Sequence, residues 1–326
     1  MPTISTTFAS FHNLFGYLGA DSIGYLLVDE AGQSPPQAAA GAIYRAKKAI
    51  IVGDPLQIQP VVTIPKSINK VLLEYYNIEQ ECDILQESAQ TLADTANEFG
   101  TYVDKSNNAQ WVGCPLLVHR RCLEPMFGVS NFIAYGNKMI QATIFNKSFN
   151  EEIYPKSTWI NVPASNFDGL WSHVEGKVVL QFLSKIIHAT NTLPSLYIIS
   201  PFKYVEHNMK KYLRSNLWQF KSALSSQQQA ELQKWIRNSV GTIHSFQGKQ
   251  ADAVILLLGG DPDKPGAINW ASDYPNILNV AITRAKNLLF VVGNHNIWSK
   301  KPHFQELSSA LSTSTIEEIL QEKIDV

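Results

Sequence analysis

The chain has 326 residues, of which 45% are hydrophobic and 17% charged, and its formal net charge at pH 7 is −1. This composition is typical of globular proteins and excludes a disordered or fibrous chain, and the length suits about two domains. The balanced charge does not by itself indicate a nucleic-acid-binding protein, although a local basic groove is enough to attract phosphates.

Cysteine usage and hydropathy indicate the compartment. Three cysteines are too few for a disulfide framework, which favours a reducing environment. No apolar run reaches the roughly 18 residues that a membrane-spanning helix needs. The first Lys or Arg is Arg45, so the N-terminus lacks the basic region of a secretory signal. We therefore expect a soluble, intracellular (cytoplasmic) protein with no membrane partner.

Two short apolar runs near the N-terminus each end at acidic residues. Residues 26–28 lead into Asp29 and Glu30, and residues 49–52 lead towards Asp54. Continuous apolar runs of this length are typical of strands covered on both faces. Carboxylates at the ends of two such strands suggest a nucleotide site at the edge of a parallel sheet.

The segment between these two runs predicts a helix. Ser34 is suited to cap it, Pro35 suits its first position, and an alanine-rich stretch continues to Ala46. A strand–helix–strand unit of this length forms a right-handed crossover, so the two strands should be parallel.

The rest of the chain divides into two parts. Residues 66–100 have a mixed helical pattern that ends at Gly100, and the polar run 104–110 follows. We place the domain boundary in that run, so that residues 1–108 form a partial first domain with a helical connector and residues 109–326 form the second. The second part again alternates between strands and helices. Its expected strands lie in 158–163, 196–202, 240–246, 252–260 and 287–294, and its expected helices in 176–190, 222–238 and 313–326.

Five motifs occur in a characteristic order: LLVDEAGQ, IIVGDPLQIQPVV, LLVHRRC, VGTIHSFQGKQADAVI and NVAITRAKNLLFVVGN. In this order they resemble superfamily 1 helicases, in particular the branch that contains the nonsense-mediated-decay RNA helicase and the Okazaki-fragment helicase-nuclease. The resemblance runs from ISTTFAS near the N-terminus to Asn294. It implies an α/β fold of two RecA-like parallel-sheet domains (the P-loop NTPase fold) that bind ATP and Mg²⁺ between them. It also implies translocation on single-stranded DNA or RNA with 5′-to-3′ polarity.

The resemblance implies catalytic roles for three residues of the first part and a nucleotide-binding role for a fourth. Asp29 would hold Mg²⁺ and Glu30 would orient the attacking water. Phosphoryl transfer needs such a pair because positioning and charge neutralisation supply most of the catalysis. Gln57 would sense the terminal phosphate, and Asp54 would support it beside the nucleotide.

In the second part, the resemblance implies that Arg121 and Arg284 reach across to the nucleotide. A guanidinium keeps its charge and can stabilise the charge that develops on the transferred phosphoryl group. Asn276 is suited to cap a helix that carries Arg284.

Two positions depart from the family pattern. The family has an aromatic residue that stacks on the base just before the first arginine, and this chain has Arg120, whose flat guanidinium can also stack. The motif FQGKQAD, which adds Gly248 to the expected nucleotide-binding residues, has Gln250 in place of the glutamate tied to the ribose. An amide can still hydrogen-bond a hydroxyl, so we expect weaker and not abolished binding.

The resemblance also implies a path for the nucleic-acid strand. Small hydroxyls and exposed amides suit phosphate contacts that read no sequence. The cluster MKKYLR and the run SKKPH would add electrostatic attraction, although each alone is also typical of a solvated face. The expected nucleic-acid contacts are Thr7, Ser200, Pro201, Thr242 and Lys203, with Lys210, Lys211 and Arg214 as the basic cluster.

Two alternative metal chemistries are less favoured. Cys114, His119 and Cys122 have a spacing that suits zinc, but a fourth ligand is missing nearby. A metal-dependent nuclease built on Asp29, Glu30 and Asp54 is also conceivable. It would leave Gln57, Arg121 and Arg284 unexplained.

The phosphate-loop pattern G-x-x-x-x-G-K-[S/T] is absent from the sequence. The pairs Gly176-Lys177 and Gly248-Lys249 are not followed by Ser or Thr, and both come after the acidic motifs. We therefore expect a chain that begins midway through the first RecA-like domain, exposes an apolar edge or face, and alone binds and hydrolyses ATP poorly. A fragment, a truncated frame and a split gene whose loop lies on a separate polypeptide all stay open. So does a non-catalytic helicase half that binds nucleic acid or a partner.

Overall fold

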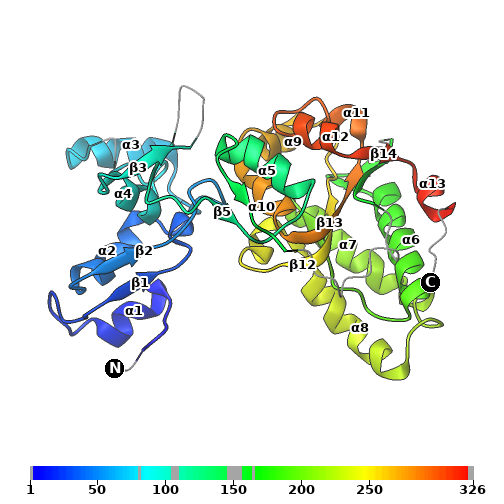
Figure 1. The fold of residues 1–326 in the computed structure, drawn as a ribbon, viewed down its shortest axis with the longest axis horizontal. Coiled ribbons are helices and arrows are strands. Elements are labelled where there is room, and N and C mark those ends of the chain that lie inside the picture. Colours follow the sequence, from blue (N-terminus) through cyan, green and yellow to red (C-terminus); the bar gives the residue numbers. More distant parts are fainter. Residues whose placement is uncertain (1–2, 80–81, 104–109, 145–155, 164–165, 322–326) are drawn as a thin grey trace. The chain divides into compact units, whose positions relative to one another are not determined.

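The computed structural model describes residues 3–79, 82–103, 110–144, 156–163 and 166–321 (Figure 1). The chain folds as two compact units, Met1–Leu116 and Leu117–Val326. The boundary predicted between residues 108 and 109 lies outside the described residues. In the described ranges, no helix is long and apolar enough to cross a membrane.

The first unit contains a parallel pair of short strands, β1 (Leu26–Val28) and β2 (Ala49–Ile51), which α2 (Pro36–Tyr44) connects. The predicted strand–helix–strand order and parallel pairing are therefore confirmed. The predicted helix start is wrong by one residue, because Pro35 is the N-cap and Ser34 does not cap the helix. The Ser34 hydroxyl instead donates to the carbonyl oxygen of Pro35 at 3.3 Å.

The core of this unit is small. Val28, Ala31, Ala39 and Ala89 form its buried centre. Because the core is small, apolar side chains stay in solvent: Leu27 and Ile50 are opposite each other on β1 and β2 and are 71% and 49% exposed. The remaining elements are α1 (Phe8–Phe15), α3 (Lys66–Tyr75), α4 (Ala89–Thr95) and the antiparallel pair β3 (Gly100–Tyr102) and β4 (Trp111–Gly113). Gly100 thus begins a strand, whereas the sequence had suggested that a helix ends there.

The second unit is built on a six-stranded sheet in which all neighbouring strands are parallel. Its strands, in spatial order, are β11 (Val240–Thr242), β10 (Leu196–Ser200), β12 (Ala251–Leu257), β13 (Ala285–Gly293), β7 (Thr158–Asn161) and β14 (Ser312–Ser314). The five strands predicted from apolar runs are all present. The sixth was missed, because Thr313 and Ser314 were assigned to the predicted helix 313–326, whereas α13 (Ile316–Gln321) begins at Ile316 in the structure.

Helices cover this sheet. The helices α6 (His173–Thr190), α7 (Lys203–Ser215) and α8 (Ser226–Ser239) group together in Figure 1. The central strands β12 and β13 are buried along almost their whole length, which explains their continuous apolar sequence. The other elements are α5 (Met126–Tyr135), α9 (Pro265–Ser272), α10 (Pro275–Ile282), α11 (His295–Trp298), α12 (Phe304–Ala310), and the short strands β5 (Val118–His119), β6 (Ile140–Gln141), β8 (Phe167–Asp168) and β9 (Trp171–Ser172).

Candidate functional site

The loops that follow β1 and β2 pack against each other, backbone to backbone. The amide of Ala31 donates to the carbonyl oxygen of Val52 at 2.9 Å. A Cβ on Gly53 would lie 2.6 Å from the Gly32 nitrogen, so only glycine fits this approach. The close contact brings together the two loops that carry the acidic residues.

The first acidic loop holds Asp29 and Glu30 in a defined turn. The Glu30 amide donates to Asp29 Oδ1 at 2.9 Å, and Gln33 Nε2 donates to Glu30 Oε2 at 3.1 Å. Glu30 has left-handed backbone angles (φ 54°), a conformation that costs a non-glycine residue about 1–3 kcal/mol. The Asp29 side chain is exposed. This geometry presents two neighbouring carboxylates from a strained turn at the end of a strand.

In the second acidic loop, Asp54 fixes Gln57. Asp54 Oδ1 accepts from the Leu56 amide and Asp54 Oδ2 accepts from Gln57 Nε2, both at 2.9 Å. The Gln57 amide also donates to the Asp54 carbonyl oxygen at 3.2 Å. Asp54 thereby orients the glutamine side chain.

Beneath these loops lies a buried pair that the sequence analysis missed. Gln90 Nε2 donates to Asp94 Oδ1 at 2.9 Å, and the Gly113 amide donates to the same oxygen at 3.0 Å. Burial raises the pKa of the Asp94 carboxyl, and the charge of Asp54 adds to the rise, against the lowering effect of the two hydrogen bonds. The available signal was a Gln and an Asp four residues apart on one helix face.

In the second unit, the exposed Arg120 and Arg121 lie on the loop between β5 and α5. The Cys122 amide donates to His119 Nε2 at 3.0 Å, and the Cys122 Sγ lies 2.9 Å from the same nitrogen. Burial raises the pKa of the Cys122 thiol to about 12, although the charges of Arg121 and Arg284 both lower it. Both guanidinium groups therefore act on the same buried thiol.

Arg284 itself is buried, with 1% of its surface exposed. Its Nε donates to the carbonyl oxygen of Val280 at 3.0 Å, and its Nη1 donates to that of Lys249 at 3.3 Å. It lies beyond the end of α10, whose N-cap is Tyr274, so the expectation that Asn276 caps a helix carrying Arg284 is wrong. In this structure the guanidinium group hydrogen-bonds to the backbone carbonyl groups of Val280 and Lys249.

The Lys249 contact ties Arg284 to the expected ribose-binding loop. Gly248 has φ 74°, which favours glycine, and Gln250 is exposed. The Ala251 amide donates to the Arg284 carbonyl oxygen at 3.0 Å. Arg284 and this loop are therefore held together within one unit.

Four of the five expected nucleic-acid contacts meet at one edge of the sheet. Ser200 ends β10 and is the register partner of Thr242, which ends β11. Pro201 follows Ser200 directly, and Lys203 begins α7. Thr7 is exposed in the first unit, next to the start of α1.

The expected metal sites receive different support. Among the described residues, no group of three or more His, Cys, Asp and Glu side chains is arranged to hold a metal ion. The zinc spacing of the sequence is used differently, since His119 and Cys122 bond to each other and Cys114 is exposed. For Mg²⁺ the exposed carboxylate of Asp29 is chemically suited, because Mg²⁺ usually takes one or two carboxylates and completes its shell with water and phosphate oxygens.

The chain matches the AAA domain family over residues 119–296, which is more than half of its length. It is 26% identical over 299 residues to "Regulator of nonsense transcripts 1" of Dictyostelium discoideum, a match that covers 90% of this chain and 20% of that protein. It is 24% identical over 302 residues to "Probable helicase senataxin" of Mus musculus, covering 86% of this chain and 10% of that protein. The "Uncharacterized ATP-dependent helicase MG140 homolog" of Mycoplasma pneumoniae is 24% identical over 277 residues, with 80% of this chain and 22% of that protein covered.

Two viral helicases are among the solved structures that resemble the chain. "The structure of PRRSV helicase" has a TM-score of 0.39 at 13% identity and covers 84% of this chain and 36% of that chain. "Complex structure of Arterivirus nonstructural protein 10 (helicase) with DNA" has a TM-score of 0.39 at 15% identity, and the match covers 85% of this chain and 41% of that chain.

The chain belongs to the AAA domain family. Within it, the chain is a portion of a superfamily 1 helicase, of the branch that contains regulator of nonsense transcripts 1 and senataxin. It spans only about a tenth to a fifth of the length of these two relatives.

Proposed function

We propose that this chain forms part of an ATP-dependent motor that moves on single-stranded DNA or RNA, with 5′-to-3′ polarity. The observation that carries the proposal is the contact between the two acidic loops, which gathers Asp29, Glu30, Asp54 and Gln57 at the ends of two parallel strands. Carboxylates and a fixed amide at such a position suit the binding and hydrolysis of a nucleotide triphosphate.

The roles of individual residues follow from their chemistry. Asp29 would hold Mg²⁺, which neutralises charge on the phosphates, and Glu30 would orient the attacking water. Gln57, oriented by Asp54, would contact the terminal phosphate. From the second unit, Arg121 would stabilise developing charge, Arg284 would hold the ribose-binding loop, and Arg120, Gly248 and Gln250 would contact base and ribose.

The phosphate-loop pattern is absent from these 326 residues, so its backbone amides and lysine would have to come from another segment or another polypeptide. We therefore propose that the chain alone holds ATP weakly. The division into domains at residue 108 and a cytoplasmic location also stay proposals, which limited proteolysis and cell fractionation would test.

A non-catalytic half that only binds nucleic acid is the second candidate, favoured by the exposed basic residues around Thr242. Titration of a labelled single strand with the chain, with and without millimolar ATP and Mg²⁺, separates the two. A motor portion should bind the strand with an affinity that changes when the nucleotide is added. Strand binding that ignores the nucleotide supports the second candidate, and no strand binding contradicts both.

A further inference from the structure

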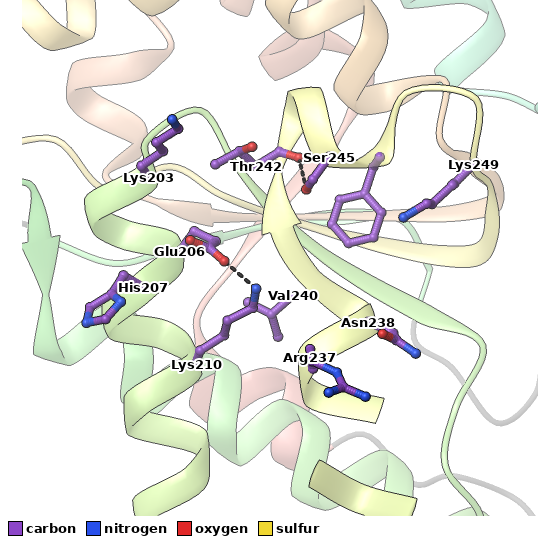
Figure 2. Close-up of a pocket in the computed structure, with 11 residues that line it drawn as sticks. Lys203, Glu206, His207, Lys210, Arg237, Asn238, Val240, Thr242, Ser245 and Lys249 are labelled. Carbon is purple, nitrogen blue, oxygen red and sulfur yellow. Dashed lines mark hydrogen bonds and ion pairs between the residues drawn. The ribbon is translucent and has the colours of Figure 1, made fainter. Parts of the chain in front are cut away.

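A groove in the second unit extends away from the strand-contact edge defined by Ser200 and Thr242. It has a volume of about 400 Å³ and lies between α7 and the segment that runs from the end of α8 through β11 (Figure 2). In Figure 2, Lys203 and Thr242 lie at one end of the drawn residues, and Arg237 and Asn238 lie at the other. Lys203 and Thr242, two of the expected contacts, thus mark one end of this groove, and Lys210 of the expected basic cluster also lines it.

The groove is strongly basic although the chain as a whole is not. Its lining includes Lys203, Lys210, Arg237 and Lys249, against the single carboxylate of Glu206. Glu206 forms an ion pair with Lys210. In the part of the chain that the structure describes, no carboxylate lies within ion-pair distance of the other three cationic groups. Three positive charges therefore face the groove without compensation.

The floor of the groove is apolar and well packed. Val240 and Phe246 are 2% and 1% exposed, and the Phe246 ring stacks on Tyr197 with 4.3 Å between ring centroids. Lys249 Nζ lies 5.6 Å from the centroid of the Phe246 ring. The exposed charged groups therefore surround an apolar, well-packed floor.

The dimensions suit a polymer of anions more than a single small anion. Lys203 and Lys210 are seven residues apart on α7, which is about 10 Å along the helix axis. A basic lining that extends over this length beside Thr242 suits a chain of phosphodiesters, whose backbone can be bound without its sequence being read.

We infer that the groove is a second phosphate subsite, in which Arg237 and Lys249 bind the phosphodiester backbone of the same nucleic-acid strand beyond its contacts at Ser200 and Thr242. This inference rests on the proposed strand-binding function. It assigns a nucleic-acid contact to Arg237, which no helicase motif in the sequence includes.

The test is fluorescence anisotropy of the full chain with single-stranded oligonucleotides of about 4 to 16 nucleotides, at several salt concentrations. Arg237→Gln should weaken binding of the longer oligonucleotides about five- to ten-fold at 50 mM salt and lower the salt slope by about 0.7, the value of one phosphate contact on a single strand. The shortest oligonucleotides, which reach only the Ser200 and Thr242 end, should be unaffected.

Two further variants sharpen the result. Glu206→Gln removes the only carboxylate of the groove lining and leaves Lys210 unpaired, so it should strengthen binding of the longer oligonucleotides and steepen the salt slope. Lys234→Gln removes an exposed charge of α8, the helix that also carries Arg237, at a position that does not line the groove, and it serves as the matched control.

The outcomes separate the two proposals. If the wild-type chain binds strands and Arg237→Gln equals Lys234→Gln at every length, the groove inference is overturned while the proposed function stands. If poly-glutamate of equal charge competes as well as the oligonucleotide, the groove binds acidic peptide and the inference is also overturned. If the wild-type chain binds no strand, the proposed function fails and the inference fails with it.

Discussion

His119 Nε2 accepts the amide of Cys122 at 3.0 Å and lies 2.9 Å from its Sγ, so one imidazole closes the loop that carries Arg120 and Arg121. Burial, with the charge of Arg121, lowers the pKa of His119. A lower pKa favours the neutral ring, in which Nε2 can accept the Cys122 amide. The carbonyl oxygen of Cys122 accepts from Thr143 Oγ1 at 3.1 Å, which holds the other side of the residue.

His119→Ala should destabilise the second unit by about 1–3 kcal/mol, because the Cys122 amide loses its acceptor in a buried position. Thermal unfolding measures the loss. His119→Gln retains an acceptor oxygen and should recover part of the stability. His207→Ala, at an exposed histidine of the same unit, is the control and should change the midpoint little. Equal midpoints for both alanine variants would show that the loop does not depend on this contact.

Gly53→Ala should destabilise the first unit and disturb the acidic loops. The added Cβ would lie 2.6 Å from the Gly32 nitrogen and 2.8 Å from that of Ala31, so the two loops must separate. A cost of about 1–3 kcal/mol is expected for such overpacking. Gly19→Ala is the matched control, since nothing lies within 4 Å of a Cβ there. Unfolding midpoints and protection of the two loops against proteolysis would distinguish Gly53→Ala from Gly19→Ala. If Gly53→Ala unfolds at the same midpoint as Gly19→Ala, the two loops are not in tight contact.

Glu175 predicts a specific pH dependence of stability. Burial raises its pKa to about 8, against the hydrogen bond that Oε2 accepts from the Gly259 amide at 2.9 Å. The carboxyl therefore stays protonated in the folded chain while the unfolded chain ionises above its ordinary pKa of 4.5. Stability should fall as pH rises from about 4.5 to about 8, by an amount on the order of a few kcal/mol.

The variant Glu175→Gln keeps an oxygen that can accept from Gly259 and cannot ionise. Denaturant unfolding across that pH window should give a flatter curve for the variant than for the wild-type chain. Parallel curves for the two proteins would mean that the buried carboxyl is not protonated in the folded state.

The exposed pair Leu27 and Ile50 predicts self-association of the chain. These side chains face solvent on neighbouring strands of a two-stranded sheet, which is an apolar surface that invites contact. Leu27→Thr should lower the apparent mass in concentration-dependent sedimentation. Val71→Thr, at a residue of α3 that is 62% exposed, removes a single apolar side chain and should have no effect. A wild-type chain that stays monomeric at all concentrations would refute the prediction.

Sequence patterns predicted the parts of the fold that depend on local order. The runs that became β12 and β13 are apolar throughout because both faces are covered, and the crossover through α2 follows from handedness. The parallel pairing of β1 and β2 also brought Asp29 and Asp54 to one end of the pair, which the sequence had suggested.

Tertiary contacts that no local pattern encodes were missed. The short strand Ser312–Ser314 is polar and forms because β7 offers a partner 154 residues away in sequence. The burial of Arg284 depends on carbonyl groups of Val280 and Lys249 that only the folded chain brings within reach. The Gln90–Asp94 pair looks like an ordinary polar helix face until the Gly113 amide closes over it.

ATP hydrolysis by the purified chain, with and without single-stranded DNA or RNA, tests the central claim most directly. The control is Glu30→Gln, which removes the proposed water-orienting carboxylate and keeps the side chain's shape. The account predicts that the chain binds the strand but turns over little ATP, at the same low rate as the variant, because the phosphate loop is not among its residues. Strand-stimulated turnover of about 1 s⁻¹ or more that disappears in Glu30→Gln would contradict it, since a complete nucleotide site would then exist within these 326 residues.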